Sequence, residues 1–302
     1  MWAGATVAVS VLAGAGAMLA WAMPTGAILG PLARMLDAYA PWLLALGLIL
    51  AAVAVVLGAR RTGSLLTLAL ALAGAVQVSA YLSATRPAEP ALPGDLRVLF
   101  FNAFAENASN GARIVAAALE TEADILIFAE AEALLGDLDT LTERYAFVSP
   151  CGAEACELLI ATTLPVLRSW QLQLNPAWPA RYAVTEVDLA GHGPLFIAAG
   201  HLVKPWMSGL AEPELAQLTA QLNWLTGPSV VVGDFNMPPW SQPMRALLEE
   251  SGFTALRGAP GTWPAAAPGP FRIPIDQVLV VQGGPGTGKT ASTLWAIDWL
   301  ME

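Results

Sequence analysis

Six polar side chains stand at the ends of short apolar segments in the second part of the chain. They are Asn102, Glu130, His201, Asp234, Asn236 and Asp276. Carboxylate and amide oxygens are the ligands that a hard divalent cation prefers in proteins. Strand ends that lead into loops are also the usual place for sites on α/β scaffolds. The pattern therefore favours a polar, cation-binding site at the edge of a sheet.

The elements that would position these side chains are visible as short runs rich in β-branched residues. The expected strands are residues 97–102, 124–129, 158–163, 166–173, 182–189, 195–199, 229–233, 275–281 and 293–299. The expected helices are residues 112–120, 130–144, 212–225 and 242–251. Because strands outnumber helices, and both hairpin and crossover connections occur, we expect an α/β fold. Its two mixed β-sheets would pack as a four-layer α/β sandwich, not as one doubly wound parallel sheet.

Three apolar stretches without charged residues precede this domain, at about 2–23, 41–59 and 65–84. Each is close to the roughly 20 residues that a helix needs to cross a bilayer. We expect three transmembrane helices, with residues 1–84 forming an anchor. A cleaved signal peptide is the alternative for the first stretch, but no Lys or Arg precedes it and it is long for such a peptide. A soluble bundle of buried helices is the alternative for all three.

The charges are divided unevenly between the two parts of the chain. Residues 1–94 carry four Lys/Arg and two acids, whereas residues 95–302 carry ten Lys/Arg and twenty-two acids. An acidic domain repels phosphates, so duplex nucleic acid is disfavoured as a partner. Arg60 and Arg61 lie between the second and third stretches, and the positive-inside rule places such a turn in the cytoplasm. The domain would then be extracytoplasmic.

Two short segments affect how the parts are joined and held. Residues 85–95 contain three prolines, which predicts a linker that is neither helix nor strand. Residues 96–302 would then form the second domain. Cys151 and Cys156 are the only cysteines and lie in an expected loop. Outside the cytoplasm they could form a disulfide, and two separate thiols are the alternative.

The polar residues belong to short motifs that resemble those of the endonuclease/exonuclease/phosphatase family, in the family's order over residues 95–281. The motifs are Phe-Phe-Asn-Ala-Phe at 100–104, Asp-Ile-Leu-Ile-Phe-Ala-Glu ending at Glu130, Gly-His-Leu at 200–202, Gly-Asp-Phe-Asn at 233–236, Thr-Trp-Pro at 262–264 and Ile-Asp at 275–276. The resemblance implies the family's fold and hydrolysis of phosphate esters with a divalent metal, Mg²⁺ or Mn²⁺. Membrane-anchored bacterial members have a similar layout, which implies a bacterial inner membrane.

The resemblance also implies a role for each residue. Glu130 would be the principal metal ligand, and Asn102 would help to hold or position the metal. His201 would hydrogen-bond the phosphate, and Asp234 would orient or activate the attacking water. Asn236 would bind a phosphate oxygen, with Asp276 as a further acidic partner. Without the resemblance, Glu130 would be a helix N-terminal charge, and Asp234 and Asn236 would be turn formers.

The chain departs from the family pattern near its C-terminus. The family's final Ser-Asp-His is absent, because the only histidines are His192 and His201, and Gln277 follows Asp276 where many members have His. Residues 283–290 instead fit the phosphate-loop pattern Gly-x4-Gly-Lys-Thr, although only twelve residues follow Thr290.

These features leave three hypotheses for the function. The first is a membrane-tethered, metal-dependent phosphoesterase, with a small-molecule or lipid phosphate ester favoured as substrate. The second is a catalytically degenerate member that binds a ligand or partner. The third is a nucleotide-binding protein that uses the loop at 283–290.

Overall fold

The computed structural model describes residues 2–23, 27–89, 95–152 and 155–281. The expected strand at 293–299 and the glycine-rich loop at 283–290 lie outside these ranges.

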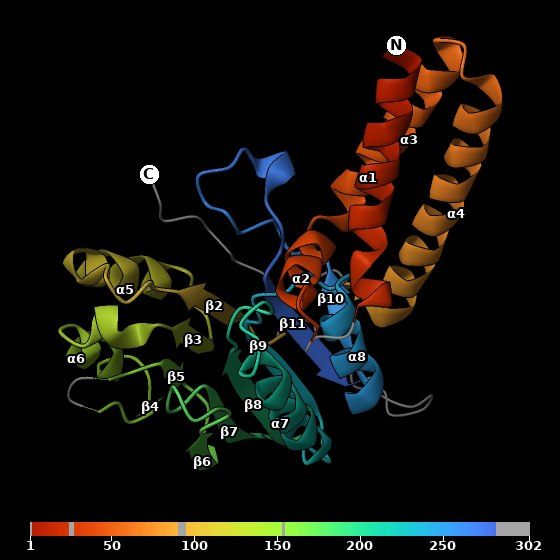
Figure 1. The fold of residues 1–302 in the computed structure, drawn as a ribbon. Helices are drawn as coiled ribbons and strands as arrows, with labels where there is room; N and C mark the ends of the chain where they lie inside the picture. Colours follow the sequence, from red (N-terminus) through yellow and green to blue (C-terminus); the bar gives the residue numbers. More distant parts are fainter. Residues whose placement is uncertain (1, 24–26, 90–94, 153–154, 282–302) are drawn as a thin grey trace.

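Four helices form the N-terminal part, as Figure 1 shows: α1 (Trp2–Ala22), α2 (Gly30–Ala38), α3 (Ala40–Val56) and α4 (Arg60–Ala84). By length and composition α1 and α4 could each cross a membrane, and α2 with α3 could form a third span that is bent by 77°. Small residues allow the helices to approach closely. Ser10 of α1, for example, donates a 2.7 Å hydrogen bond to the carbonyl of Gly47 in α3.

Helix α2 was not predicted; it lies in the segment between the first two expected membrane helices. Pro41 lies in the first turn of α3. Pro41 has no N–H with which to continue the hydrogen bonds of α2, which explains why α2 and α3 are separate helices. Asp37 of α2 accepts a 2.6 Å hydrogen bond from the backbone N–H of Gln242, the first residue of α8. Since a helix N-terminus favours a negative charge, this contact docks the anchor onto the second part of the chain.

Two mixed sheets make up the second part. The larger has the order β1-β10-β11-β9-β8-β7-β6, and the smaller has the order β2-β3-β5-β4. Their bounds are β1 Thr85–Pro87, β2 Val98–Asn102, β3 Ile125–Ala129, β4 Phe147–Val148, β5 Leu158–Thr162, β6 Val166–Leu172, β7 Tyr182–Leu189, β8 Gly193–His201, β9 Ser229–Asp234, β10 Phe253–Arg257 and β11 Asp276–Val281.

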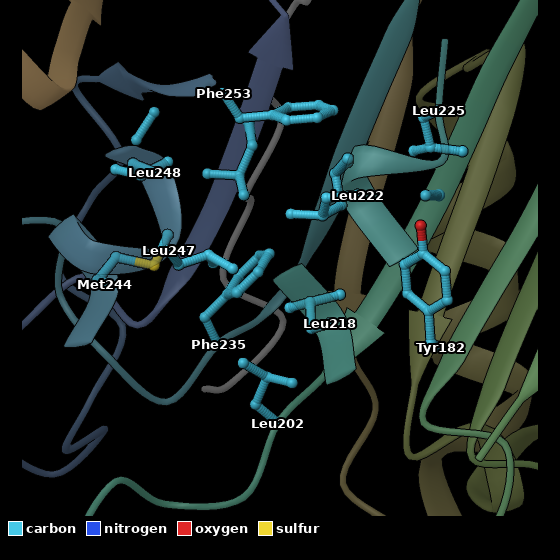
Figure 2. Close-up of a cluster of buried hydrophobic side chains, with 14 of the residues drawn as sticks. Tyr182, Leu202, Leu218, Leu222, Leu225, Phe235, Met244, Leu247, Leu248 and Phe253 are labelled. Atoms are coloured by element: carbon cyan, nitrogen blue, oxygen red, sulfur yellow. The ribbon is translucent and has the colours of Figure 1, made fainter. Parts of the chain in front are cut away.

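The outer faces of the sheets are covered by α5 (Gly111–Glu120), α6 (Leu138–Thr142), α7 (Ala211–Asn223) and α8 (Gln242–Ser251), which complete four layers. Three short 3₁₀ helices lie in connecting segments: η1 (Ala108–Asn110), η2 (Ala131–Leu134) and η3 (Gly269–Phe271). One apolar cluster lies between the two sheets, a second beneath α5 and α6, and a third beneath α7 and α8 (Figure 2). The predicted α/β sandwich is therefore confirmed.

Two local predictions were wrong. The first three residues of the expected linker form strand β1, which pairs in parallel with β10, a strand that was also not predicted. A proline is tolerated there because β1 is an edge strand. Proline lacks a backbone N–H, and at the edge of a sheet this removes no hydrogen bond between interior strands. The single helix expected at 130–144 is replaced by η2 and α6. Gly136 and Asp137, a breaker and an N-cap residue, separate them.

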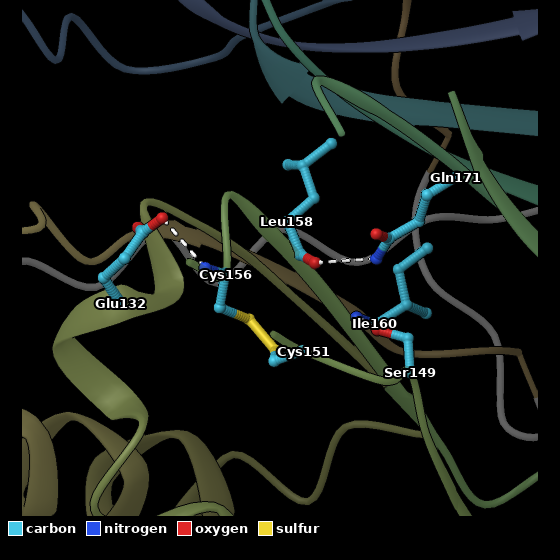
Figure 3. The surroundings of a disulfide bond; sticks show 7 residues. All are labelled: Glu132, Ser149, Cys151, Cys156, Leu158, Ile160 and Gln171. Carbon is cyan, nitrogen blue, oxygen red and sulfur yellow. Dashed lines mark hydrogen bonds between the residues drawn. A yellow bond between two sulfur atoms is a disulfide. The ribbon is translucent and has the colours of Figure 1, made fainter. Parts of the chain in front are cut away.

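Cys151 and Cys156 form a disulfide, which settles the alternative left open by the sequence (Figure 3). Glu132 accepts a 2.9 Å hydrogen bond from the backbone N–H of Cys156, as the figure also shows. The bridge therefore fixes the segment that leads into β5.

Candidate active site

Strand pairing brings the predicted residues to one place. In the larger sheet, Asp234 at the end of β9 is opposite His201 at the end of β8 and Asp276 at the start of β11. In the smaller sheet, Asn102 ends β2 beside the end of β3, directly before Glu130. All six residues line one cleft of about 460 Å³ between the ends of the two sheets.

Asn102 connects the two sheets at this cleft. Its amide Nδ2 donates hydrogen bonds to Glu130 Oε1 at 3.0 Å and to Asp234 Oδ2 at 3.1 Å. Its amide oxygen accepts a 3.0 Å bond from the backbone N–H of Phe104. In this arrangement Asn102 positions the two carboxylates, rather than directing its oxygen toward a cation.

Glu130 is held in an uncommon backbone conformation. Its φ is 51°, in the left-handed region, which costs about 1–3 kcal/mol for a residue with a side chain. The surroundings keep it there, since its N–H donates to the carbonyl of Glu157 at 2.8 Å and its Oε2 accepts from Ala105 N at 3.0 Å. Glu130 is also the N-cap residue of a short 3₁₀ helix, η2, and its carboxylate lines the cleft.

Asp234 and Asn236 form a turn and line the cleft at the same time. The backbone N–H of Asn236 donates to Asp234 Oδ1 at 2.8 Å, and Asn236 Nδ2 donates to the carbonyl of Leu202 at 2.8 Å. Burial raises the pKa of Asp234, although His201, the Asn236 N–H and Asn102 act against this rise. The turn geometry thus fixes a buried carboxylate at the cleft.

Sequence reasoning missed Glu157 and Arg181, which hold His201 from behind. Nδ1 of His201 pairs with the carboxylate of Glu157, and Arg181 Nη2 lies 3.6 Å from the same carboxylate. Arg181 Nη1 also donates to the carbonyl of His201 at 3.0 Å. Burial disfavours a charged His201, but the bond to Glu157 and the charge of Asp234 outweigh it, so the pKa of His201 is raised.

Asp276 is a buried carboxyl group whose protonated form is favoured at neutral pH. Burial first, and then the neighbouring Asp234, raise its pKa to about 8. Its Oδ1 is buried without a hydrogen-bond partner. Gln277, in contrast, is fully buried outside the cleft lining and donates to the carbonyl of Pro274 at 2.7 Å. The departure from the family pattern at this residue therefore does not reach the cleft.

A divalent cation fits this chemistry only in part. Among the residues that the structure describes, no three His, Cys, Asp or Glu side chains gather closely enough to hold a metal ion. Magnesium, however, is commonly bound by one or two carboxylates and completed by water and substrate phosphate. Glu130 offers such a carboxylate at the cleft, and the buried Oδ1 of Asp276 has no hydrogen-bond partner in the protein. The donor set fits a weakly held ion that a phosphate completes.

The cleft has further residues that the motifs did not assign. Lys204 supplies a cation to its wall, and the aromatic residues Phe101, Phe104 and Trp263 supply an apolar side. Trp263 also packs against Trp206, with ring centroids 6.3 Å apart. The cleft is thus polar at the strand ends and apolar toward its rim.

This fold and site agree with a family match. The sequence matches the model of the Endonuclease/Exonuclease/phosphatase family over residues 98–294, and the chain therefore belongs to that family. Its members include hydrolases of phosphate esters. No curated protein matches the sequence.

Several solved structures are similar in fold. Sphingomyelinase C from Streptomyces griseocarneus has 14% identity and a TM-score of 0.48, over 63% of this chain and 85% of that one. TDP2 of D. rerio, complexed with a single strand DNA product, has 14% identity and a TM-score of 0.49, over 64% and 86%. An endonuclease/exonuclease/phosphatase from Beutenbergia cavernae has 18% identity and a TM-score of 0.43, over 62% and 64%.

Proposed function

We propose that the protein is a membrane-tethered, divalent-metal-dependent phosphoesterase. The observation that carries this proposal is the convergence of Asn102, Glu130, His201 and Asp234 in one cleft of a chain that belongs to a phosphoesterase family.

Each side chain has a defined task in this proposal. Mg²⁺ or Mn²⁺, held through Glu130, would stabilise charge on the phosphate oxygens. His201, whose raised pKa favours the protonated ring, donates a hydrogen bond to a phosphate oxygen. Asp234 is fixed by Asn102 and by the Asn236 N–H, and it orients the attacking water and takes up its proton. Asn236 and Asp276 complete the polar wall.

The protein would lie in a bacterial inner membrane with the catalytic domain outside the cytoplasm. Three observations support this placement. Two or three N-terminal helices could cross a membrane, and Arg60 and Arg61 are the first residues of α4, at the end that adjoins α3. The Cys151–Cys156 bridge is of a kind that persists in oxidising compartments.

The test is hydrolysis of bis(p-nitrophenyl) phosphate by the full chain in detergent micelles, with Mg²⁺ or Mn²⁺ and with EDTA. Turnover should require the metal and should fall at least a hundredfold in Glu130→Ala and in Asp234→Ala. Glu132→Ala is the matched control, because this carboxylate lies two residues away and bonds the Cys156 N–H outside the cleft lining. Metal binding without turnover would instead support the degenerate, ligand-binding alternative.

A further inference from the structure

The loop that closes one side of the cleft is exposed and carries no charge. Residues 258–271, here called the rim loop, contain no Asp, Glu, Lys or Arg and consist mainly of Ala, Gly and Pro. Phe271, near its end, is 58% exposed. An uncharged segment of this length with an exposed Phe beside a cleft is suited to contact an apolar partner or a membrane.

The rim loop lies against the end of the anchor that faces the domain. Trp42, in the first turn of α3, donates a 3.0 Å hydrogen bond from Nε1 to the carbonyl of Pro270. Trp263 of the loop belongs to the apolar cluster that includes Ala38 and Tyr39, between α2 and α3. In Figure 1 the loop that carries η3 rises from the domain on the side of the anchor helices. Trp and Tyr favour the membrane–water interface, so this contact sets the loop at that depth.

Helix α2 supports the same placement of the interface. The axes of α2 and α3 differ in direction by 77°. With α3 crossing the membrane, α2 would therefore lie nearly parallel to the membrane surface. Leu32 and Met35 of α2 are exposed, as are Ile28 and Leu29 just before it, whereas Asp37 is buried against α8. A helix with one apolar exposed face and one polar docked face is suited to lie in an interface.

The same loop forms part of the cleft wall. Thr262, Trp263 and Ala265 line the cleft together with Phe101 and Phe104, and Phe104 is 57% exposed. The apolar rim of the cleft is thus continuous with the surface that meets the membrane, while Glu130 and Lys204 lie at the polar end.

We propose that the substrate is a phosphate ester of a lipid in the protein's own membrane; this inference rests on the proposed phosphoesterase function. The rim loop and α2 sit in the interface, and the lipid's phosphate enters the polar end while its hydrocarbon part stays along Phe104 and Trp263. Water adds to phosphorus and the P–O bond to the leaving alcohol breaks. One proton of the water ends on that alcohol, and the other stays on the phosphate.

The first test compares lipid and soluble esters with the full chain in vesicles of phosphatidylcholine and phosphatidylglycerol. Phosphorus NMR follows the lipids, and bis(p-nitrophenyl) phosphate reports soluble turnover. Phe271→Asp should lower the ratio of lipid to soluble turnover at least tenfold. Leu167→Asp should leave this ratio unchanged, because Leu167 is equally exposed, at 57%, but lies on β6 at the opposite edge of the larger sheet from β1.

The second test locates the rim loop without depending on turnover. Both native cysteines are joined in the disulfide, so Phe271→Cys and Leu167→Cys each offer one thiol for a fluorescent label. Lipids with a nitroxide on the acyl chain should quench the label at 271 and not at 167. Equal quenching at both positions, or soluble turnover without lipid turnover, overturns the lipid inference alone. Absence of turnover for both esters overturns the phosphoesterase function, and the lipid inference with it.

Discussion

Replacing Glu157 with Gln tests whether the ion pair behind His201 matters for both stability and turnover. The side chains of Glu157, Arg181 and His201 are 14%, 9% and 7% exposed, so the group is nearly removed from water. Removing one partner of a buried ion pair costs about 3–5 kcal/mol. A Gln side chain can still form one hydrogen bond, worth about 1 kcal/mol, which leaves an expected loss of about 3 kcal/mol.

This loss corresponds to a fall in melting temperature of roughly 6–12 °C for a domain of this size. Circular dichroism of the full chain in detergent micelles measures it. Turnover should also fall, because His201 loses the partner that fixes its ring. We expect kcat to drop about ten- to hundredfold with little change in KM. This drop is smaller than the full rate contribution of a general acid or base, because His201 itself remains.

Glu186→Gln is the matched control for this experiment. Glu186 is also a largely buried carboxylate in an ion pair, but its partner Arg168 is 65% exposed. Pairs with an exposed partner contribute about 0–1 kcal/mol, so this variant should melt within a few degrees of the wild type. Equal melting temperatures for the two variants would refute the reasoning about burial. A destabilised Glu157→Gln with unchanged kcat would refute the positioning role.

Three further substitutions test other parts of the structure. Asn102→Ala removes the donor shared by both cleft carboxylates, and kcat should fall about tenfold or more while the melting temperature moves little. Trp240→Ala deletes the bond to the Ala38 carbonyl and the aromatic contact with Trp42, and should cost about 3–5 kcal/mol in thermal unfolding. Cys151→Ser removes the disulfide that closes a short loop and should lower the free energy of unfolding by about 2 kcal/mol. Reductant should cause the same loss in the wild type and no further loss in the variant, which would assign the effect to the disulfide.

The site could be predicted from sequence to the extent that it depends on strand ends. Asn102, His201 and Asp234 each end an apolar run, and paired strands carry such ends to a common edge. The order of the family motifs then fixed which polar residues to expect. The two sheets were predicted in the same way. Apolar runs separated by a short turn indicate hairpins, and apolar runs separated by a longer helical segment indicate crossovers.

The parts that sequence missed depend on contacts between distant segments. Glu157 and Arg181 each directly precede an apolar strand, and this position was the only sign in the sequence of a role at the site. The residues around them in the sequence do not indicate that the two side chains meet behind His201. Strand β1 has a composition that disfavours strands, and it forms because Arg257 of β10 donates to its Thr85 carbonyl at 2.8 Å. Helix α2 is likewise stabilised by its docking onto α8 more than by its own nine residues.

The incorporation of β1 into the larger sheet has a consequence for where the protein can act. Helix α4 runs into an edge strand without a flexible spacer, since it ends at Ala84 and β1 begins at Thr85. A rigid mount of this kind holds the cleft at a constant height and a constant orientation. Under the proposed membrane placement, the protein would therefore work in cis, on molecules that diffuse in two dimensions around it, and it would not reach a facing bilayer.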